Sequence, residues 1–90
     1  MKAGFHAHGR VQGVGYRWFV SQEAQALGLA GWVRNEPDGS VSGEAAGDFS
    51  RLEAFRDRLV QGHSSSRVSR LDWWVVDEGQ SLPRPFEIRR

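Results

Sequence analysis

Apolar and polar residues alternate at the start of the chain. In residues 2–8, Phe5 and the alanines two positions to either side share one face, and His6 and His8 lie on the other. A period of two is typical of a β-strand with one face buried. We therefore expect a strand here, with Phe5 on its core side.

The period changes to that of a helix from about Tyr16, where apolar residues recur every three or four positions. They form one stripe made of Tyr16, Val20, Ala24 and Leu27. Gly28 suits the left-handed position just beyond a helix end, and Leu29 can close over Ala24 in a Schellman-type stop. The pattern predicts a helix that ends before Gly28.

A β-hairpin is predicted next. Residues 30–35 and 41–45 are short segments with strand character, and residues 37–40 between them read Pro-Asp-Gly-Ser. These residue types favour tight turns because they supply a fixed φ, a side-chain acceptor and a left-handed conformation.

A second helix is predicted after the hairpin. Ser50 and Glu53 have the spacing of a capping box, with Phe49 and Ala54 as the accompanying apolar staple, and Asp48 is an alternative N-cap. The residues expected to face inward are Leu52, Phe55 and Leu59.

Two further strands complete the pattern. Gly62 ends the helix, residues 68–77 read as a fourth strand, and residues 86–88 read as a short fifth. One face of the fourth strand is expected to carry Leu71, Trp73 and Val75.

The order βαββαβ with an edge strand predicts an α+β protein with the ferredoxin-like split βαβ plan. Residues 1–90 would form a single domain, with an antiparallel sheet and both helices on one face. In this plan the first two strands run parallel, so their carboxyl ends share one edge of the sheet. The loop at 9–16 and the end of the second strand, at Arg34 and Asn35, could then line one pocket.

Composition limits the function classes that fit. Ninety residues leave room for one core, and the absence of cysteine removes disulfides, thiolate nucleophiles and zinc–thiolate sites. The net charge of +1 is too small to attract a polyanion by its overall field. No apolar run is long enough for a signal peptide or a membrane span, so we expect a cytoplasmic, membrane-free protein. We also expect a free-standing monomer.

The loop after the first strand carries the candidate chemistry. Residues 9–17 read GRVQGVGYR, and the glycines allow consecutive N–H groups to turn toward one point. A helix start adds unpaired N–H groups and a positive dipole end, which together attract an anion such as phosphate. Arg17 can present two parallel donors to phosphate oxygens. No Lys and Ser/Thr pair follows the last glycine, and Trp18 occupies the third glycine position of the dinucleotide fingerprint, so nucleotide binding is not indicated.

Longer motifs strengthen the case that this loop is a phosphate-binding site. The stretch GRVQGVGYRWFV, the stretch LGLAGWVRN at 27–35 and the stretch DGSV at 38–41 resemble the acylphosphatase family, and the similarity extends over nearly the whole chain. The resemblance implies a ferredoxin-like enzyme that hydrolyses acyl phosphates to a carboxylate and inorganic phosphate, with no metal and no cofactor. Phosphate would be the product and a competitive inhibitor.

The resemblance also implies roles for particular residues. Arg17 would bind the phosphoryl group and Asn35 would orient the attacking water. The phosphate cradle would be the main chain of Gln12, Gly13, Val14, Gly15 and Tyr16. Tyr16 departs from the pattern, because phenylalanine is common at that position.

Other readings of these residues remain open. Arg10 and Arg34 are as cationic as Arg17, but by position we expect solvated charges. His6 and His8 could be paired metal ligands, yet a metal site needs a third converging ligand that the sequence does not identify. No metal site is therefore predicted.

Two alternative functions also remain. Ferredoxin-like RNA-binding modules stack bases on sheet aromatics, which here could be Trp32, Trp73 and Trp74. The third strand has no aromatic where such modules need one and the charge is balanced, so nucleic acid is not the expected partner. The chain could also be a noncatalytic module of the kind that begins larger maturation proteins handling carbamoyl phosphate.

Overall fold

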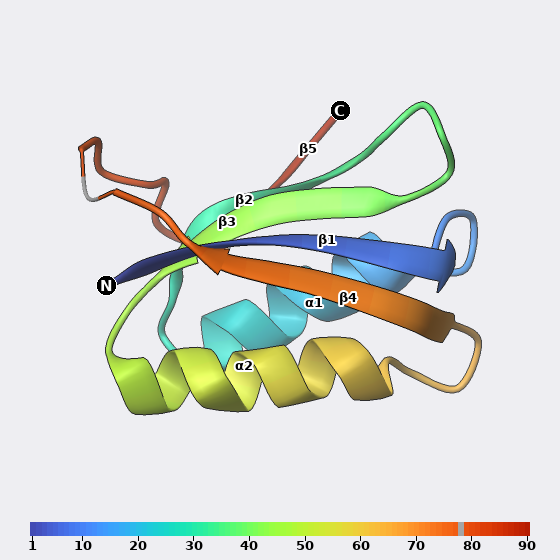
Figure 1. The fold of residues 1–90 in the computed structure, drawn as a ribbon, viewed down its shortest axis with the longest axis horizontal. Coiled ribbons are helices and arrows are strands. Elements are labelled where there is room, and N and C mark those ends of the chain that lie inside the picture. The colour runs from blue at the N-terminus through green and yellow to red at the C-terminus, as the bar shows by residue number, and fades with distance from the viewer. Residues whose placement is uncertain (78) are drawn as a thin grey trace.

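The computed structural model describes residues 1–77 and 79–90 as a sheet with two helices packed on one face (Figure 1). The elements follow the order β1 (Lys2–Arg10), α1 (Tyr16–Ala26), β2 (Ala30–Asn35), β3 (Val41–Ala46), α2 (Phe49–Gln61), β4 (Arg67–Val75) and β5 (Glu87–Arg89). This is the predicted βαββαβ order with a short fifth strand, and the ferredoxin-like α+β fold is confirmed.

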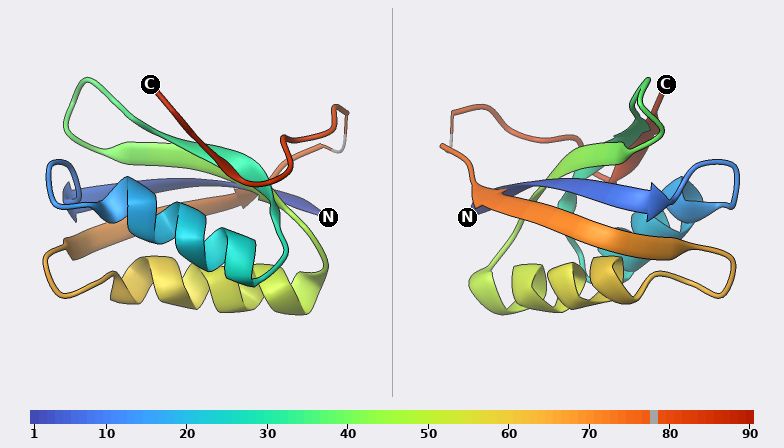
Figure 2. Two further views of the ribbon diagram at one scale, coloured as in Figure 1. Left: turned by 180° about the vertical axis from the view of Figure 1, so that it is seen from behind. Right: turned by 45° about the vertical axis from the view of Figure 1, so that its right-hand side comes forward.

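The strands lie in the order β4-β1-β3-β2-β5. The pairs β4–β1, β1–β3 and β3–β2 are antiparallel, and β5 pairs in parallel with β2 at the edge, so the complete sheet is mixed. Because β3 separates β1 from β2 and runs antiparallel to both, β1 and β2 are parallel. Their carboxyl ends lie at the same end of the sheet, together with the loop at 11–15 and the hairpin between β2 and β3 (Figures 1 and 2).

The core lies between the sheet and the two helices. Phe5 on β1 is fully buried and meets the ring of Phe55 on α2 edge-on, with centroids 5.6 Å apart. Phe86, just before β5, packs against the same Phe55 ring at 5.9 Å. Residues of every predicted apolar stripe contribute, chiefly Phe5, Ala7, Tyr16, Val20, Ala24, Val33, Val41, Ala45, Leu52, Phe55, Leu59 and Phe86.

The end of α1 follows the predicted Schellman geometry. Gly28 has φ 70°. Its N–H donates to the carbonyl of Gln25 at 3.0 Å, and the N–H of Leu29 donates to the carbonyl of Ala24 at 2.9 Å. This stop sets the direction of β2, and hence the place of Asn35.

Of the two N-caps predicted for α2, the alternative, Asp48, is confirmed, and the capping box of Ser50 and Glu53 was wrong. Asp48 is the N-cap, and its carboxylate accepts from the N–H of Arg51 at 2.9 Å. Ser50 lies inside the helix and donates to Asp48 instead. The expected staple is absent because Gly47, which precedes the cap, has no side chain, and Phe49 is left 61% exposed.

The predicted core face of β4 is also only partly correct. Leu71 and Trp73 pack against the core, but Val75 is 69% exposed. Val75 lies at the end of an edge strand, where no neighbouring strand covers its far side. Within the described residues, no helix has the length and apolarity needed to cross a bilayer.

Candidate active site

The loop between β1 and α1 turns through two glycines in left-handed conformation. Gly13 has φ 72° and Gly15 has φ 79°. A Cβ built on either glycine would meet no atom within 4 Å, so the backbone angle and not crowding requires glycine here. The space next to both glycines is open.

The first turn of α1 is left without a cap. Gly15 is the N-cap residue and offers no side-chain acceptor, and the turn contains no acidic residue. The first helical bond runs from the N–H of Phe19 to the carbonyl of Gly15 at 3.0 Å. The N–H groups of residues 16–18 precede it and have no partner within the helix, so this helix end favours an anion.

Arg17 lies in this uncapped turn at the wall of the cavity described below. Its Nη1 donates to the carbonyl oxygen of Arg89 on β5 at 3.1 Å. The bond uses one of five guanidinium donors. It ties the guanidinium to the sheet edge while leaving donors for a ligand.

Asn35 reaches the same place from the end of β2. It is two positions beyond Val33, which is fully buried, so both side chains point to the helix side of the sheet. Its Oδ1 is buried, and no described residue donates a hydrogen bond to it. A buried carbonyl oxygen without a donor costs about 1–3 kcal/mol unless a ligand or water supplies one.

A cavity of about 200 Å³ joins these parts. Its lining comprises Val11, Gly13, Gly15, Tyr16, Arg17, Trp18, Asn35 and Ile88. Trp18 is 64% exposed and Ile88 42%, so the mouth has an apolar rim. The structure thus brings Arg17, Asn35 and three of the five predicted cradle residues to one cavity.

The other two predicted cradle residues have different surroundings. Val14 packs against the core. The side-chain amide of Gln12 donates to the carbonyls of Glu36 at 2.7 Å and Ser40 at 2.8 Å. Gln12 therefore fastens the glycine-rich loop to the β2–β3 hairpin. Sequence reasoning missed this contact, since nothing local in the chain marks an amide that bonds across 24 residues.

Tyr16 connects the start of α1 to the end of α2. Its ring is buried, and its hydroxyl donates to the carbonyl of Leu59 at 2.8 Å. That carbonyl belongs to the last turn of α2, where carbonyls have no helical partner. Burial raises the pKa of the Tyr16 phenol well above its ordinary value. The hydroxyl is thus a structural donor in its neutral form.

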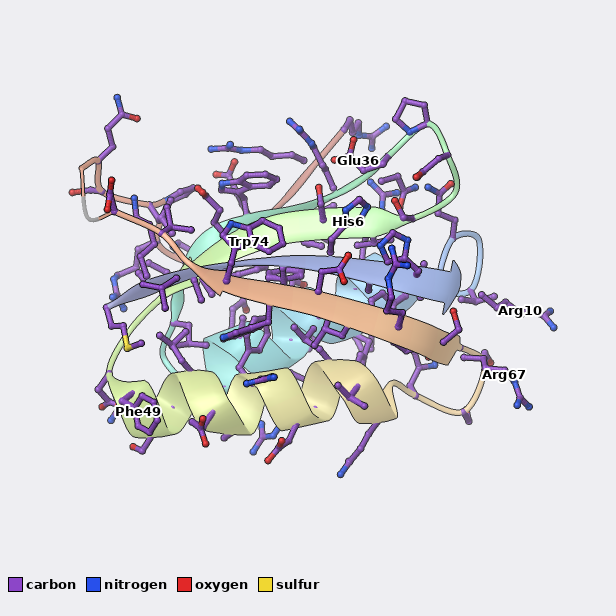
Figure 3. All side chains as sticks on the ribbon, viewed as in Figure 1. His6, Arg10, Glu36, Phe49, Arg67 and Trp74 are labelled. Carbon is purple, nitrogen blue, oxygen red and sulfur yellow. The ribbon has the colours of Figure 1, made fainter. Side chains whose placement is uncertain are left out.

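The other cations named from the sequence point elsewhere. Arg34 pairs with Glu36 at 2.9 Å and stacks over Trp32 at 5.0 Å, on the sheet face without helices. Arg10 extends into solvent at the end of β1, near Arg67 (Figure 3). Neither lines the cavity.

The three sheet tryptophans do not share one surface. Trp73 packs on the helix side under the guanidinium of Arg56, whereas the neighbouring Trp74 covers Gly4 on the open face. Trp32 is flanked by Arg34 and Arg89. The RNA-binding alternative needs the three rings on one open face of the sheet, and Trp73 lies on the opposite face.

The fold and its cavity define a ferredoxin-like α+β protein with a glycine-rich helix start at the site. Comparison with known proteins places it more narrowly, because the family model for acylphosphatase matches residues 3–88. The chain is 47% identical over 83 residues to the acylphosphatase of Cupriavidus pinatubonensis, covering 92% of this chain and 89% of that one. The chain belongs to the acylphosphatase family, and it is a hydrolase of acyl phosphates.

Solved structures agree with this assignment. The acylphosphatase from Bacillus subtilis matches with a TM-score of 0.86 and 35% identity, covering 99% of this chain and 98% of that one. HypF from T. kodakarensis matches with a TM-score of 0.85 and 29% identity, but this chain covers only 12% of it. The same fold therefore also occurs as a small segment of a much larger protein.

Proposed function

We propose that the chain hydrolyses small acyl phosphates without a metal ion, holding the phosphoryl group in the loop at 12–16. The main-chain N–H groups of this loop and of the first turn of α1 surround the phosphoryl oxygens, and Arg17 adds its guanidinium. Asn35 orients the attacking water. The observation that carries the proposal is the buried Oδ1 of Asn35, which lacks a donor at a cavity shared with Arg17 and an uncapped helix start.

The chemistry fits this set of groups. Phosphoryl transfer passes through a loose transition state with charge spread over the equatorial oxygens, so positioned donors supply most of the catalysis. The leaving group is a carboxylate, which is stable as an anion near neutral pH and needs no acid to protonate it. The absence of Asp, Glu and His from the described cavity lining is consistent with this requirement.

The same lining supports metal independence. Carboxylate and imidazole are the usual protein ligands of Mg²⁺ and Zn²⁺, and the cavity wall offers neither. Tyr16 is not available as an acid, because its hydroxyl is bonded to Leu59 and burial raises its pKa. Charge stabilisation therefore falls to Arg17 and the backbone.

Asn35 would activate the attacking water by orienting it and not by removing its proton. The Asn35 amide oxygen accepts from the water and its NH₂ group donates, but the amide is not basic enough to remove a proton near neutral pH. The water proton would pass late to a phosphate oxygen. The pH profile should then show no enzyme group titrating between about pH 5 and 8.

The apolar rim bears on the substrate. Trp18 and Ile88 flank the mouth of the cavity, where the acyl group of a bound substrate would lie. Small aliphatic or aromatic acyl phosphates fit this surface. We further propose that residues 1–90 act as one domain and as a monomer.

The test is hydrolysis of benzoyl phosphate in excess EDTA, with inorganic phosphate as a competitor. We expect turnover with competitive inhibition by phosphate, and Arg17→Ala should lower the rate at least ~10²-fold. Arg10→Ala is the matched control, since Arg10 extends from the same end of the sheet but lies outside the cavity. Full loss of turnover in EDTA, or equal effects of the two substitutions, would contradict the proposal.

A further inference from the structure

A second cluster of polar side chains lies on the sheet face that the helices leave open, where Figure 3 shows His6. His6 and His8 extend from β1 two positions apart, and Asp72 on β4 is the register partner of His6. The two imidazole rings are 4.3 Å apart between centroids. Asp72 Oδ2 lies 3.1 Å from His8 Nε2. Strand β4 thus supplies the third converging ligand that the sequence did not identify.

We propose that His6, His8 and Asp72 bind a divalent transition-metal cation of the Zn²⁺ type, at a site separate from the candidate active site. One ligand atom from each side chain lies within 4.8 Å of the other two. Two ligands of one Zn²⁺ ion are about 3–4 Å apart, given bonds of about 2.0–2.2 Å. Small side-chain rotations therefore bring the three atoms onto one ion, and water completes the coordination.

The hydrogen bonds around His6 hold it in a metal-binding form. Ser40 Oγ donates its hydrogen to Asp38 Oδ1. The Ser40 oxygen is in contact with His6 Nε2 and can only accept a hydrogen bond from it. His6 Nε2 therefore carries the proton. The lone pair then lies on Nδ1. Metal-bound histidines are typically oriented in this way, by a bond from the other ring nitrogen to an oxygen.

Arg70 occupies the place where the cation would bind. Its Nη2 is 3.1 Å from His8 Nε2, and its Nε is 3.3 Å from Asp72 Oδ1. A neutral imidazole nitrogen cannot both accept from Arg70 and donate to Asp72, so one of these contacts is always unsatisfied. A cation would use the lone pairs of both His8 and Asp72. The Arg70 side chain is 66% exposed and can turn into solvent.

Carboxylates close to the cluster favour a cation. Hydrogen bonds from Ser40 hold the pKa of Asp38 below its usual range, so this carboxylate stays ionised near neutral pH. Asp38 lies on one side of the histidine pair, through Ser40, and Asp72 on the other. The histidines therefore lie between two negative charges, and the positive charge of Arg70 contacts His8 and Asp72.

The test is calorimetric titration of Zn²⁺ into untagged protein from which EDTA has been dialysed away. We expect one ion per chain. His8→Asn and Asp72→Asn should each weaken binding at least ~10-fold, because each removes a ligand. Arg70→Gln should tighten binding about threefold or more, because it removes a competing positive charge. A purely structural ion-pair network would not respond in opposite directions to these substitutions.

A second measurement on the unsubstituted protein guards against variants that fail to fold. The imidazole NMR signals of His6 and His8 should shift or broaden with one equivalent of Zn²⁺, and those of His63, which lies in the loop after α2, should not. No binding heat, equal affinity in His8→Asn, or an equal response of His63 would overturn the site. Hydrolysis in EDTA is measured separately, so the two proposals can fail independently.

Discussion

Asn35→Ala should lower activity without lowering stability. The Asn35 side chain makes no hydrogen bond to any described residue, and its Oδ1 is buried at the cavity wall. The substitution leaves no hydrogen-bond donor without its acceptor, and it opens no cavity inside the core. We expect the free energy of unfolding to stay level or to rise by up to ~1 kcal/mol.

The effect on catalysis should be large. If Asn35 aligns the attacking water, its loss should lower kcat about 10²-fold, the scale for removing one positioned polar group in a transition state. The inhibition constant for phosphate should change little, because the amide contacts the water and not the phosphoryl group. The assay is benzoyl phosphate hydrolysis over a range of substrate and phosphate concentrations, with urea unfolding of the same samples.

Gln25→Ala is the matched control. Gln25 is also an amide, but its Nε2 donates to the carbonyl of Phe86 at 2.9 Å, away from the cavity. Its removal should lower the free energy of unfolding by about 0.5–1.5 kcal/mol and leave kcat within a factor of about two. A normal kcat in Asn35→Ala would remove Asn35 from the mechanism. Equal losses in kcat and phosphate affinity would make it a phosphate ligand instead.

Three further substitutions test other parts of the site. Arg17→Lys should keep the fold but lose at least ~10²-fold in turnover, because an ammonium cannot offer two parallel donors; near-normal turnover would refute the bidentate role. Gly15→Ala should weaken phosphate inhibition and lower the free energy of unfolding by about 1–2 kcal/mol, since alanine disfavours φ 79°; unchanged inhibition would show that the loop geometry is not needed. Tyr16→Phe should cost about 1 kcal/mol through the unpaired Leu59 carbonyl. Burial raises the Tyr16 pKa above its ordinary 10.0, so the stability that the neutral phenol contributes is present below pH 10 and is lost as the pH rises above it. Between pH 8 and 11, the free energy of unfolding in urea should therefore decline less for Tyr16→Phe than for the unsubstituted protein.

The sequence predicted the order of the elements and the end of the sheet at which the candidate site lies. Alternation around Phe5 and the stripe from Tyr16 reflect local periodicity, which depends only on neighbouring residues. The parallel relation of β1 and β2 follows from the connecting helix, and it predicts that Asn35 lies beside the glycine-rich loop. Gly28 could be assigned because few residues tolerate its backbone angle.

The predictions that failed have physical causes. Asp48 and Ser50 are both good N-caps two positions apart, and local sequence does not decide between them. The place of β5 rests on a three-residue pairing with β2, for which no periodic signal exists. For the same reason the bond from Arg17 to Arg89 could not be foreseen.

The cross-strand cluster was missed for a related reason. His6 and His8 were visible as a pair, but Asp72 joins them only through the β1–β4 register, across 64 residues from His8. Local sequence does not encode that register.

An amide NMR titration with inorganic phosphate tests whether the glycine-rich loop and Arg17 hold the phosphoryl group. We expect the largest chemical-shift changes at the main-chain N–H groups of residues 12–16 and at the Arg17 guanidinium. These changes should reach half of their maximum at a phosphate concentration equal to the competitive inhibition constant measured in the hydrolysis assay. Largest changes on the open face of the sheet, with the glycine-rich loop unmoved, would contradict this assignment.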